Sequence, residues 1–324
     1  MIMTGWKQIH FIFTDELIRF VVTGRKKNIL YYRQKSIPHG LIIDGKIQDE
    51  SELIQQMKKW LKENKIGSMR AYFCIPDGQA IVRKVTVPNS VAKEELKGHL
   101  YMEIGETIHL PFNDPVLEVI DLRESEEFKE EVIFIATRES IVQEYSELLR
   151  KLKFEPTVAD LSFLSVYRLT HHLHMTDDEE PTMLAQINRN DIQITIFYKH
   201  IPLYVHHSRL DDELPIEIIR NDEGNDELII QEENKEHIVS GSYVTIASQM
   251  ERINTFFTYN ISKGSSDVKR MIVSGTHPLL KEITYKLKDH FTIPVYLIDE
   301  ECTSSLLNAN APFYFADCIG LSLK

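Results

Sequence analysis

The sequence predicts a mixed α/β protein made of two related lobes. Its 324 residues exceed what one hydrophobic core usually holds, so we expect two domains or one large domain in two lobes. Near the start, apolar runs at residues 9–13 and 17–22 flank a polar turn at residues 14–16, which is the pattern of a β-hairpin. The pattern returns in the second half, where we expect strands at residues 183–187, 192–198 and 202–206. The repeat indicates that each lobe opens with the same unit.

The composition is ordinary for a soluble globular protein, with 43% hydrophobic and 27% charged residues. A formal charge of −12 argues against broad binding to nucleic acid or to anionic membranes, which needs a basic surface. No apolar run reaches the ~18–20 residues of a membrane span, and no signal-peptide segment is present, so we expect a cytoplasmic protein that does not insert into the membrane. Three scattered cysteines predict no disulfide framework.

Most of the excess charge lies in one short segment. Between Asp211 and Glu236 there are eleven acids and two bases, so nine of the twelve excess negative charges are found there. A solvated loop is the first interpretation. A docking surface for a basic partner and a metal site are the alternatives.

The first lobe is predicted over residues 1–174. It starts with three strands within residues 7–36, followed by a helix that Ser51 caps and Gly67 ends. Apolar residues recur at three- and four-residue steps on one face of this helix: Leu53, Ile54, Met57, Trp60 and Leu61. A strand over Arg70–Ile75 follows, and a helix from Leu161 to about Leu173 closes the lobe.

Residues 80–157 interrupt this order. We expect a strand at 80–87, a helix after Ser90, strands at 116–122 and 132–137, and a helix at 139–151. A β-α-β-β-α unit of this length predicts an inserted subdomain.

An acidic linker, residues 175–181, is the predicted hinge, and the second lobe is expected over residues 182–324. Residues 211–240 show weak periodicity and are interpreted as a reduced outer subdomain. The remaining elements are expected as a helix at 243–259, a strand at 271–273, a helix at 279–290, a strand at 295–297 and a closing element at 315–323.

The opening hairpin resembles that of the actin-like (ribonuclease H-like) nucleotide-binding superfamily, which reads roughly Gly-Ile-Asp-Ile-Gly-Ser-Ser-Ser. Ile12 stands at the position of the acidic residue that holds metal-bound water, and Thr14 at that of the turn glycine. Asp15, Glu16 and Leu17 replace the serines. The frame of the hairpin is kept while its phosphate-binding residues are changed.

The segments "AIVRKVTVP", "ELKGHLYMEIGETIHLPFNDPVLEVIDL" and "EEVIFIATRESIVQEYSELLRKLKFEPTVADL" resemble the PilM family of type IV pilus assembly proteins. The marks of the pattern are Arg83, Pro88, Glu103, Leu110-Pro111-Phe112 and Val158-Ala159-Asp160. The resemblance implies an actin-like fold related to the cell-division protein FtsA. It also implies a protein recruited to the inner face of the cell membrane, where it binds the short N-terminal tail of the membrane protein PilN, beside the inserted subdomain.

The same resemblance places a degenerate nucleotide cleft at Thr14, Asp15, Glu16, Asn188, Ser274, Gly275 and Thr276. Asn188 stands where the second hairpin would carry glycine, and Thr276 where the loop after the penultimate strand would carry a second glycine. We therefore expect a scaffold that is not an enzyme and needs no cofactor. The alternatives are an ATP-binding protein with Mg²⁺, lined by Thr14, Asn188, Ser274 and Gly275, and a kinase using Asp191 or Asp211.

A histidine-rich stretch precedes the acidic linker. His171 and His174 would share one face of a helix while His172 points away. Because no second ligand group follows at a defined spacing, we predict a solvated helix end and no metal site. No GxSxG, HExxH or P-loop motif is discernible.

Overall fold

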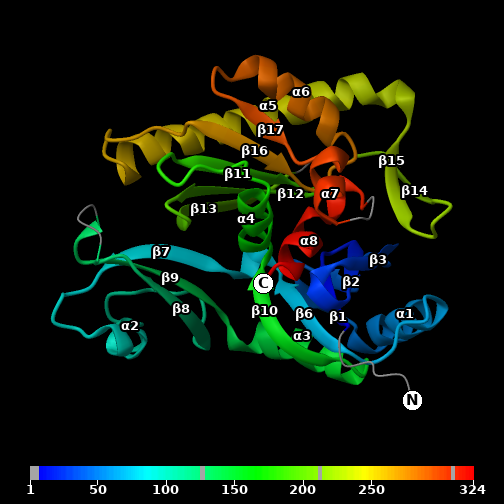
Figure 1. The fold of residues 1–324 in the computed structure, drawn as a ribbon, viewed down its shortest axis with the longest axis horizontal. Coiled ribbons are helices and arrows are strands. Elements are labelled where there is room, and N and C mark those ends of the chain that lie inside the picture. Colours follow the sequence, from blue (N-terminus) through cyan, green and yellow to red (C-terminus); the bar gives the residue numbers. More distant parts are fainter. Residues whose placement is uncertain (1–6, 125–127, 211–213, 308–310) are drawn as a thin grey trace.

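The computed structural model describes residues 7–124, 128–210, 214–307 and 311–324. It contains two five-stranded sheets, one in each lobe, with helices packed around them (Figure 1). The first sheet consists, in pairing order, of β10 (Glu155–Leu161), β6 (Arg70–Ile75), β1 (Gln8–Phe13), β2 (Leu17–Thr23) and β3 (Ile29–Ser36). The second consists of β17 (Val295–Leu297), β16 (Arg270–Ser274), β11 (Thr182–Ile187), β12 (Asp191–Tyr198) and β13 (Ile201–Arg209).

The two sheets have the same topology. In each, a hairpin (β1–β2 or β11–β12) continues into a third antiparallel strand, and a parallel strand pairs with the other side of the first one. This arrangement confirms the mixed α/β, two-lobed fold. Because both sheets place the hairpin turn at the same end, the turns of the two lobes face each other.

The helices cover the sheets and supply the rest of each core. They are α1 (Glu50–Glu63), α2 (Leu96–Glu103), α3 (Glu139–Lys151), α4 (Ser162–His172), α5 (Glu232–Phe256), α6 (Leu280–His290), α7 (Glu300–Leu307) and α8 (Ala316–Ser322). Shorter elements are β4 (Ile42–Ile43), β5 (Lys46–Ile47), four 3-10 turns at residues 25–27, 77–79, 93–95 and 313–315, and a π turn at 257–261. Within the described residues, no helix has the length and apolar composition needed to span a bilayer.

Helix α1 illustrates how the sequence sets an element. Asp49, not Ser51, caps it, because the Asp49 carboxylate accepts a hydrogen bond of 2.9 Å from the Glu52 amide. The apolar face expected from the spacing is buried: Leu53, Met57, Trp60 and Leu61.

The inserted segment forms a small sheet of its own, ordered β7 (Ile81–Thr86), β9 (Glu131–Arg138) and β8 (Pro115–Asp121), over a separate apolar core. Helix α3, expected to belong to it, packs instead in the core of the first lobe, because Ile141, Tyr145 and Leu148 all face that core. The separately packed part therefore ends near Arg138 and not at residue 157.

The last helix also differs from expectation. Helix α8 is the closing element expected in the second lobe, but its buried residues Cys318, Ile319 and Leu321 belong to the core of the first lobe. It packs against α4 so closely that a Cβ atom on Gly320 would lie 1.9 Å from the carbonyl oxygen of Ser165. The first lobe is therefore built from both ends of the described chain.

Part of the acidic segment is ordered and joins the lobes. The hairpin β14 (Ile216–Arg220) and β15 (Asp226–Ile230) lies within it, and α5 begins at Glu232, eleven residues before the expected start at 243. Asn225 Oδ1 accepts from the Gln34 amide at 2.9 Å, and Asp226 Oδ2 accepts from the Ser36 amide at 3.0 Å. This part is a contact with β3 and not a free solvated loop; residues 211–213 lie outside the described residues.

Gly320→Ala is expected to destabilise the protein by about 2 kcal/mol or more, because the added methyl group meets backbone and forces α4 and α8 apart. Gly98→Ala is the matched control: Gly98 also lies in a helix, but no atom stands within 4 Å of the position that a Cβ would take there. It is expected to stabilise the protein by about 0.5–1 kcal/mol. Urea denaturation measures both, and equal midpoints for the two variants would contradict the close approach of the helices.

Candidate functional site

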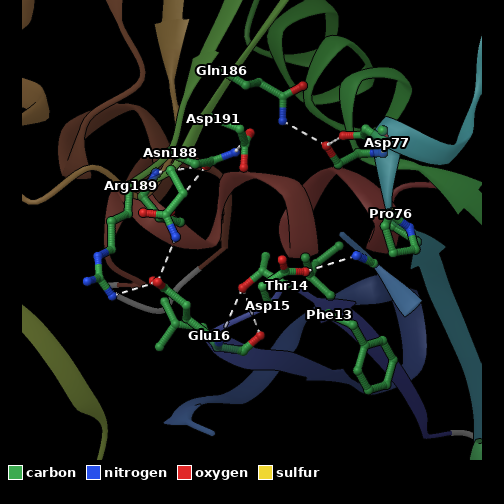
Figure 2. A pocket seen from close by; sticks show the side chains of 18 of the residues that line it. Phe13, Thr14, Asp15, Glu16, Pro76, Asp77, Gln186, Asn188, Arg189 and Asp191 are labelled. Atoms are coloured by element: carbon green, nitrogen blue, oxygen red, sulfur yellow. Dashed lines mark hydrogen bonds and ion pairs between the residues drawn. The ribbon is translucent and has the colours of Figure 1, made fainter. Parts of the chain in front are cut away.

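A cavity of about 330 Å³ lies between the lobes, where the two hairpin turns meet (Figure 2). Five of the seven predicted cleft residues line it: Thr14, Asp15, Glu16, Asn188 and Thr276. Ser274 and Gly275 are not among the lining residues. The fold thus brings the two turns to one cavity, while Ser274 and Gly275 lie outside its lining.

The first turn is closed by its own hydrogen bonds. The Thr14 amide donates to the Leu17 carbonyl oxygen at 2.9 Å, and the Leu17 amide donates to Thr14 Oγ1 at 3.0 Å. The carboxylate of Asp15 accepts from the amides of Asp44 and Gly45 at 2.8 and 3.0 Å. The side chains that replace glycine and serine therefore hold the turn and the neighbouring β4–β5 loop.

Glu16 reaches across the cavity to the second lobe. Its Oε1 lies 2.6 Å from Nη1 of Arg189 and accepts a 2.7 Å hydrogen bond from Nδ2 of Asn190 (Figure 2). Asp44 and Arg209 form a second pair at 2.6 Å between the lobes. The opposing turns are bound directly to each other.

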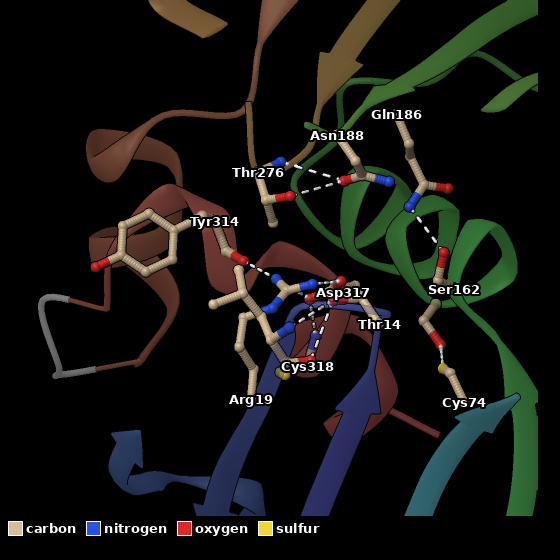
Figure 3. Close-up of polar contacts among 12 residues, drawn as sticks. Thr14, Arg19, Cys74, Ser162, Gln186, Asn188, Thr276, Tyr314, Asp317 and Cys318 are labelled. Atoms are coloured by element: carbon tan, nitrogen blue, oxygen red, sulfur yellow. Dashed lines mark hydrogen bonds and ion pairs between the residues drawn. The ribbon is translucent and has the colours of Figure 1, made fainter. Parts of the chain in front are cut away.

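The second turn is organised by Asn188. Its Nδ2 donates to Asp191 Oδ1 at 2.9 Å, and its Oδ1 accepts from the amide and hydroxyl of Thr276 at 3.2 and 3.1 Å (Figure 3). Gly275 has φ +134°, and a Cβ there would lie 2.0 Å from the Ile187 carbonyl oxygen. Gly275 is therefore needed for close backbone packing behind the cavity, where Ser274 is also buried in the sheet.

A buried ion pair lies on the wall of the cavity. Arg19, on β2, is 1% exposed and meets the carboxylate of Asp317, in the first turn of α8, through two hydrogen bonds of 2.9 and 2.7 Å. Its Nη1 also donates to the Tyr314 carbonyl oxygen (Figure 3). A two-point contact of this kind is among the strongest that an arginine makes. It fixes the end of the chain across the first-lobe hairpin.

Asp77 lies on the opposite wall, after β6. It accepts hydrogen bonds from the amide and the hydroxyl of Ser162, at 2.9 Å for the amide, and Gln186 Nε2 donates to Ser162 Oγ at 2.9 Å. Burial among protein atoms raises the pKa of Asp77 to about 7, and the hydrogen bonds from Ser162 oppose this shift. The cavity leaves part of the residue accessible. This chain of bonds links β6, α4 and β11 of the two lobes.

The lining is rich in acids, and its arginines are already engaged. Six carboxylates line the cavity: Asp15, Glu16, Asp44, Asp77, Asp191 and Asp317. The lining arginines 19, 189 and 209 each pair with one of them. A triphosphate is held by open backbone N–H groups and unpaired cations, so the residues present do not fit one.

Sequence reasoning missed Arg19 and Asp317. The one available signal was a lone charge within the apolar run of residues 17–22, since a buried charge requires a partner. The partner lies 298 residues away and carries no signal of its own.

Arg19→Met is expected to lower the free energy of unfolding by about 3–5 kcal/mol, because Asp317 is left buried without its partner. Arg209→Met is the matched control: it also breaks an arginine–aspartate pair at a lobe contact, but both side chains are about 60% exposed, so about 1 kcal/mol or less is expected. Arg19→Met with Asp317→Leu should recover part of the loss. Urea unfolding measures all three, and similar losses for the two single variants would contradict the role of the buried pair.

The comparisons with known proteins agree with this geometry. The family model for type IV pilus assembly protein PilM matches residues 16–323. Among solved structures, the chain is similar to a PilM-PilN type IV pilus biogenesis complex, at 17% identity and a TM-score of 0.74, covering 98% of this chain and 97% of that chain.

Two further structures share the fold. MreB5 of Spiroplasma citri bound to ADP is 9% identical with a TM-score of 0.51, covering 98% of this chain and 95% of that one. EutJ from Carboxydothermus hydrogenoformans is 10% identical with a TM-score of 0.50, and the match covers 98% of this chain and 89% of EutJ. The similarities to these solved structures confirm the predicted actin-like fold. No curated protein matches the sequence.

Proposed function

This chain belongs to the PilM family of type IV pilus assembly proteins, and from that premise we propose that it is a non-catalytic scaffold of a type IV pilus or competence-type machine. It acts at the inner face of the cell membrane, where it binds the short cytoplasmic tail of a PilN-like membrane protein. It binds no ATP. The observation that carries the proposal is that the arginines lining the interlobe cavity are already paired with the protein's own carboxylates.

Three contacts support the absence of ATP cycling. Arg19 is engaged by Asp317 and the Tyr314 carbonyl, and Glu16 is engaged by Arg189. A nucleotide in this cavity would meet arginines that are already paired, and its phosphates would lie among the carboxylates of the lining. At 4 Å, each pair of like charges costs about 1 kcal/mol even at the dielectric constant of water.

We expect no saturable heat when Mg-ATP is titrated into the protein up to about 1 mM, because the cleft offers carboxylates where phosphate needs N–H donors. Calorimetry measures this directly. The tail peptide of the membrane protein, titrated into the same preparation, controls for the activity of the protein. Saturable binding of Mg-ATP within this concentration range would contradict the prediction and favour the ATP-binding alternative.

The partner part of the proposal is supported by the solved PilM-PilN complex and by the position of β8 as an edge strand of the inserted sheet. An extended peptide binds readily to an exposed sheet edge. The edge of β3 is covered by Asn225 and Asp226. Along β8, by contrast, the Pro115 carbonyl and the Leu117 amide bond to the hydroxyl of Tyr101, at 3.2 and 3.3 Å, and not to another strand. We place the tail along β8, with the half-exposed ring of Tyr101 as an apolar contact.

Tyr101→Ala is expected to weaken binding of the tail peptide about tenfold, because an aromatic anchor beside the docked strand is lost. Tyr296→Ala is the matched control: Tyr296 is 44% exposed against 40% for Tyr101, and it also lies at an edge strand, β17, but in the other lobe. The affinity of the Tyr296→Ala variant for the tail peptide should stay within about twofold of wild type. Hydrogen exchange on the complex should show protection at residues 115–121. Protection confined to the second lobe would contradict the site while leaving the interaction itself intact.

A further inference from the structure

Three potential metal ligands meet at the outer side of the lobe junction. They are His171 in the last turn of α4, Asp178 in the linker, and His200 in the turn between β12 and β13. One ligand atom from each lies within 4.8 Å of the others. The sequence pattern predicted no site because α4 alone offers no complete ligand set; the fold adds His200 from the second lobe.

We propose that His171, Asp178 and His200 form a binding site for a divalent transition metal, with Zn²⁺ as the ion that fits best. Two imidazoles and one carboxylate are typical ligands of Zn²⁺, whereas Mg²⁺ and Ca²⁺ prefer all-oxygen sets. Neighbouring ligand atoms of a tetrahedral Zn²⁺ stand about 3.4 Å apart at bond lengths near 2.05 Å. The exposed side chains therefore have to close by about 1.4 Å at most, and water completes the coordination.

The imidazole of His200 is already turned toward the site. Its Nε2 lies 3.0 Å from Asp178 Oδ1, while its Nδ1 lies 3.2 Å from the hydroxyl of Tyr167. A metal ion bound by Nε2 and by Asp178 Oδ1 would replace the proton that Nε2 donates to Asp178. The remaining imidazole proton would then lie on Nδ1 and be donated to the Tyr167 hydroxyl, which is the usual arrangement of a ligating histidine. Tyr167 is held by stacking on Phe197, with ring centroids 3.7 Å apart and an interplanar angle of 12°.

His171 is arranged in a similar way. Its Nδ1 lies 3.4 Å from Thr176 Oγ1, and its ring packs edge-on against that of His200 at 4.5 Å. Both histidines thus have a polar neighbour at Nδ1. An ordinary ion pair between His200 and Asp178 would not require the convergence of His171 on the same point.

The three ligands come from the first lobe, the linker and the second lobe. A bound ion would therefore connect the two lobes and the linker, in addition to the contacts inside the cleft. This inference does not depend on the proposed function, because it uses none of the cleft or β8 residues.

We expect calorimetry with ZnCl₂ on the full chain to show one site with a dissociation constant of about 10 μM or below, and excess Zn²⁺ to raise the melting temperature. His200→Asn should weaken binding at least about tenfold; asparagine tolerates the left-handed backbone at this position, where φ is +64°. Asp178→Asn should have the same effect, and Tyr167→Phe should weaken binding about tenfold while keeping the ring stack.

His172→Asn is the matched control, since His172 is an exposed histidine in the same turn of α4 that lies outside the cluster. It should bind Zn²⁺ within about twofold of wild type. A melting temperature without metal that equals that of the wild type shows that a variant is folded. If His200→Asn is not folded by this criterion, the Zn²⁺ affinity of Asp178→Asn is the test of the site. The proposal is overturned by the absence of saturable binding up to about 100 μM Zn²⁺, by unchanged binding in the folded variant, or by an equal loss in His172→Asn.

Discussion

The structure depends first on the burial of one charge. A guanidinium removed from water costs several kcal/mol unless its hydrogen bonds are replaced, and among the described residues the two terminal nitrogens of Arg19 find replacements at Asp317 and the Tyr314 carbonyl. This requirement brings α8 back to the first lobe after the chain has completed the second. Because α8 packs on α4, and α4 begins at Ser162 beside Asp77, one ion pair positions both walls of the cleft.

The cleft then determines how the lobes relate to each other. In a protein that binds a ligand between two lobes, the ligand supplies much of the attraction between them. Here Glu16 with Arg189, Asp44 with Arg209 and Ser162 with Gln186 supply it from within the chain. The arrangement of the two lobes is therefore set by contacts within the chain.

Much of the fold could be predicted from the sequence because the signals are local. Apolar runs on either side of a polar turn marked the paired hairpins, and residue spacing marked the buried face of α1. What could not be predicted depends on contacts between distant residues. The spacing of α3 shows that it is amphipathic but not which core it faces, and no pattern shows that α8 crosses back to the first lobe. The acidic segment looked solvated because its partners, Gln34 and Ser36, lie on another lobe.

The same distinction applies to the site. The hairpin turns could be placed from the resemblance, so Thr14, Glu16 and Asn188 were expected together, and they are. Gly275 was expected at the cleft but serves the packing of β11. The ion pair on the wall of the cleft joins residues 298 positions apart, beyond the reach of any local pattern.

The return of α8 also has a consequence for biosynthesis. During translation the amino-terminal sheet emerges first, yet it lacks the helix that covers part of its core until the whole second lobe has left the ribosome. In the meantime Arg19 has no Asp317 and the apolar surface under α8 is open to water. The core of the first lobe can therefore be completed only after residues 316–322 have been synthesised, and its closure joins segments that are about 300 residues apart in the sequence.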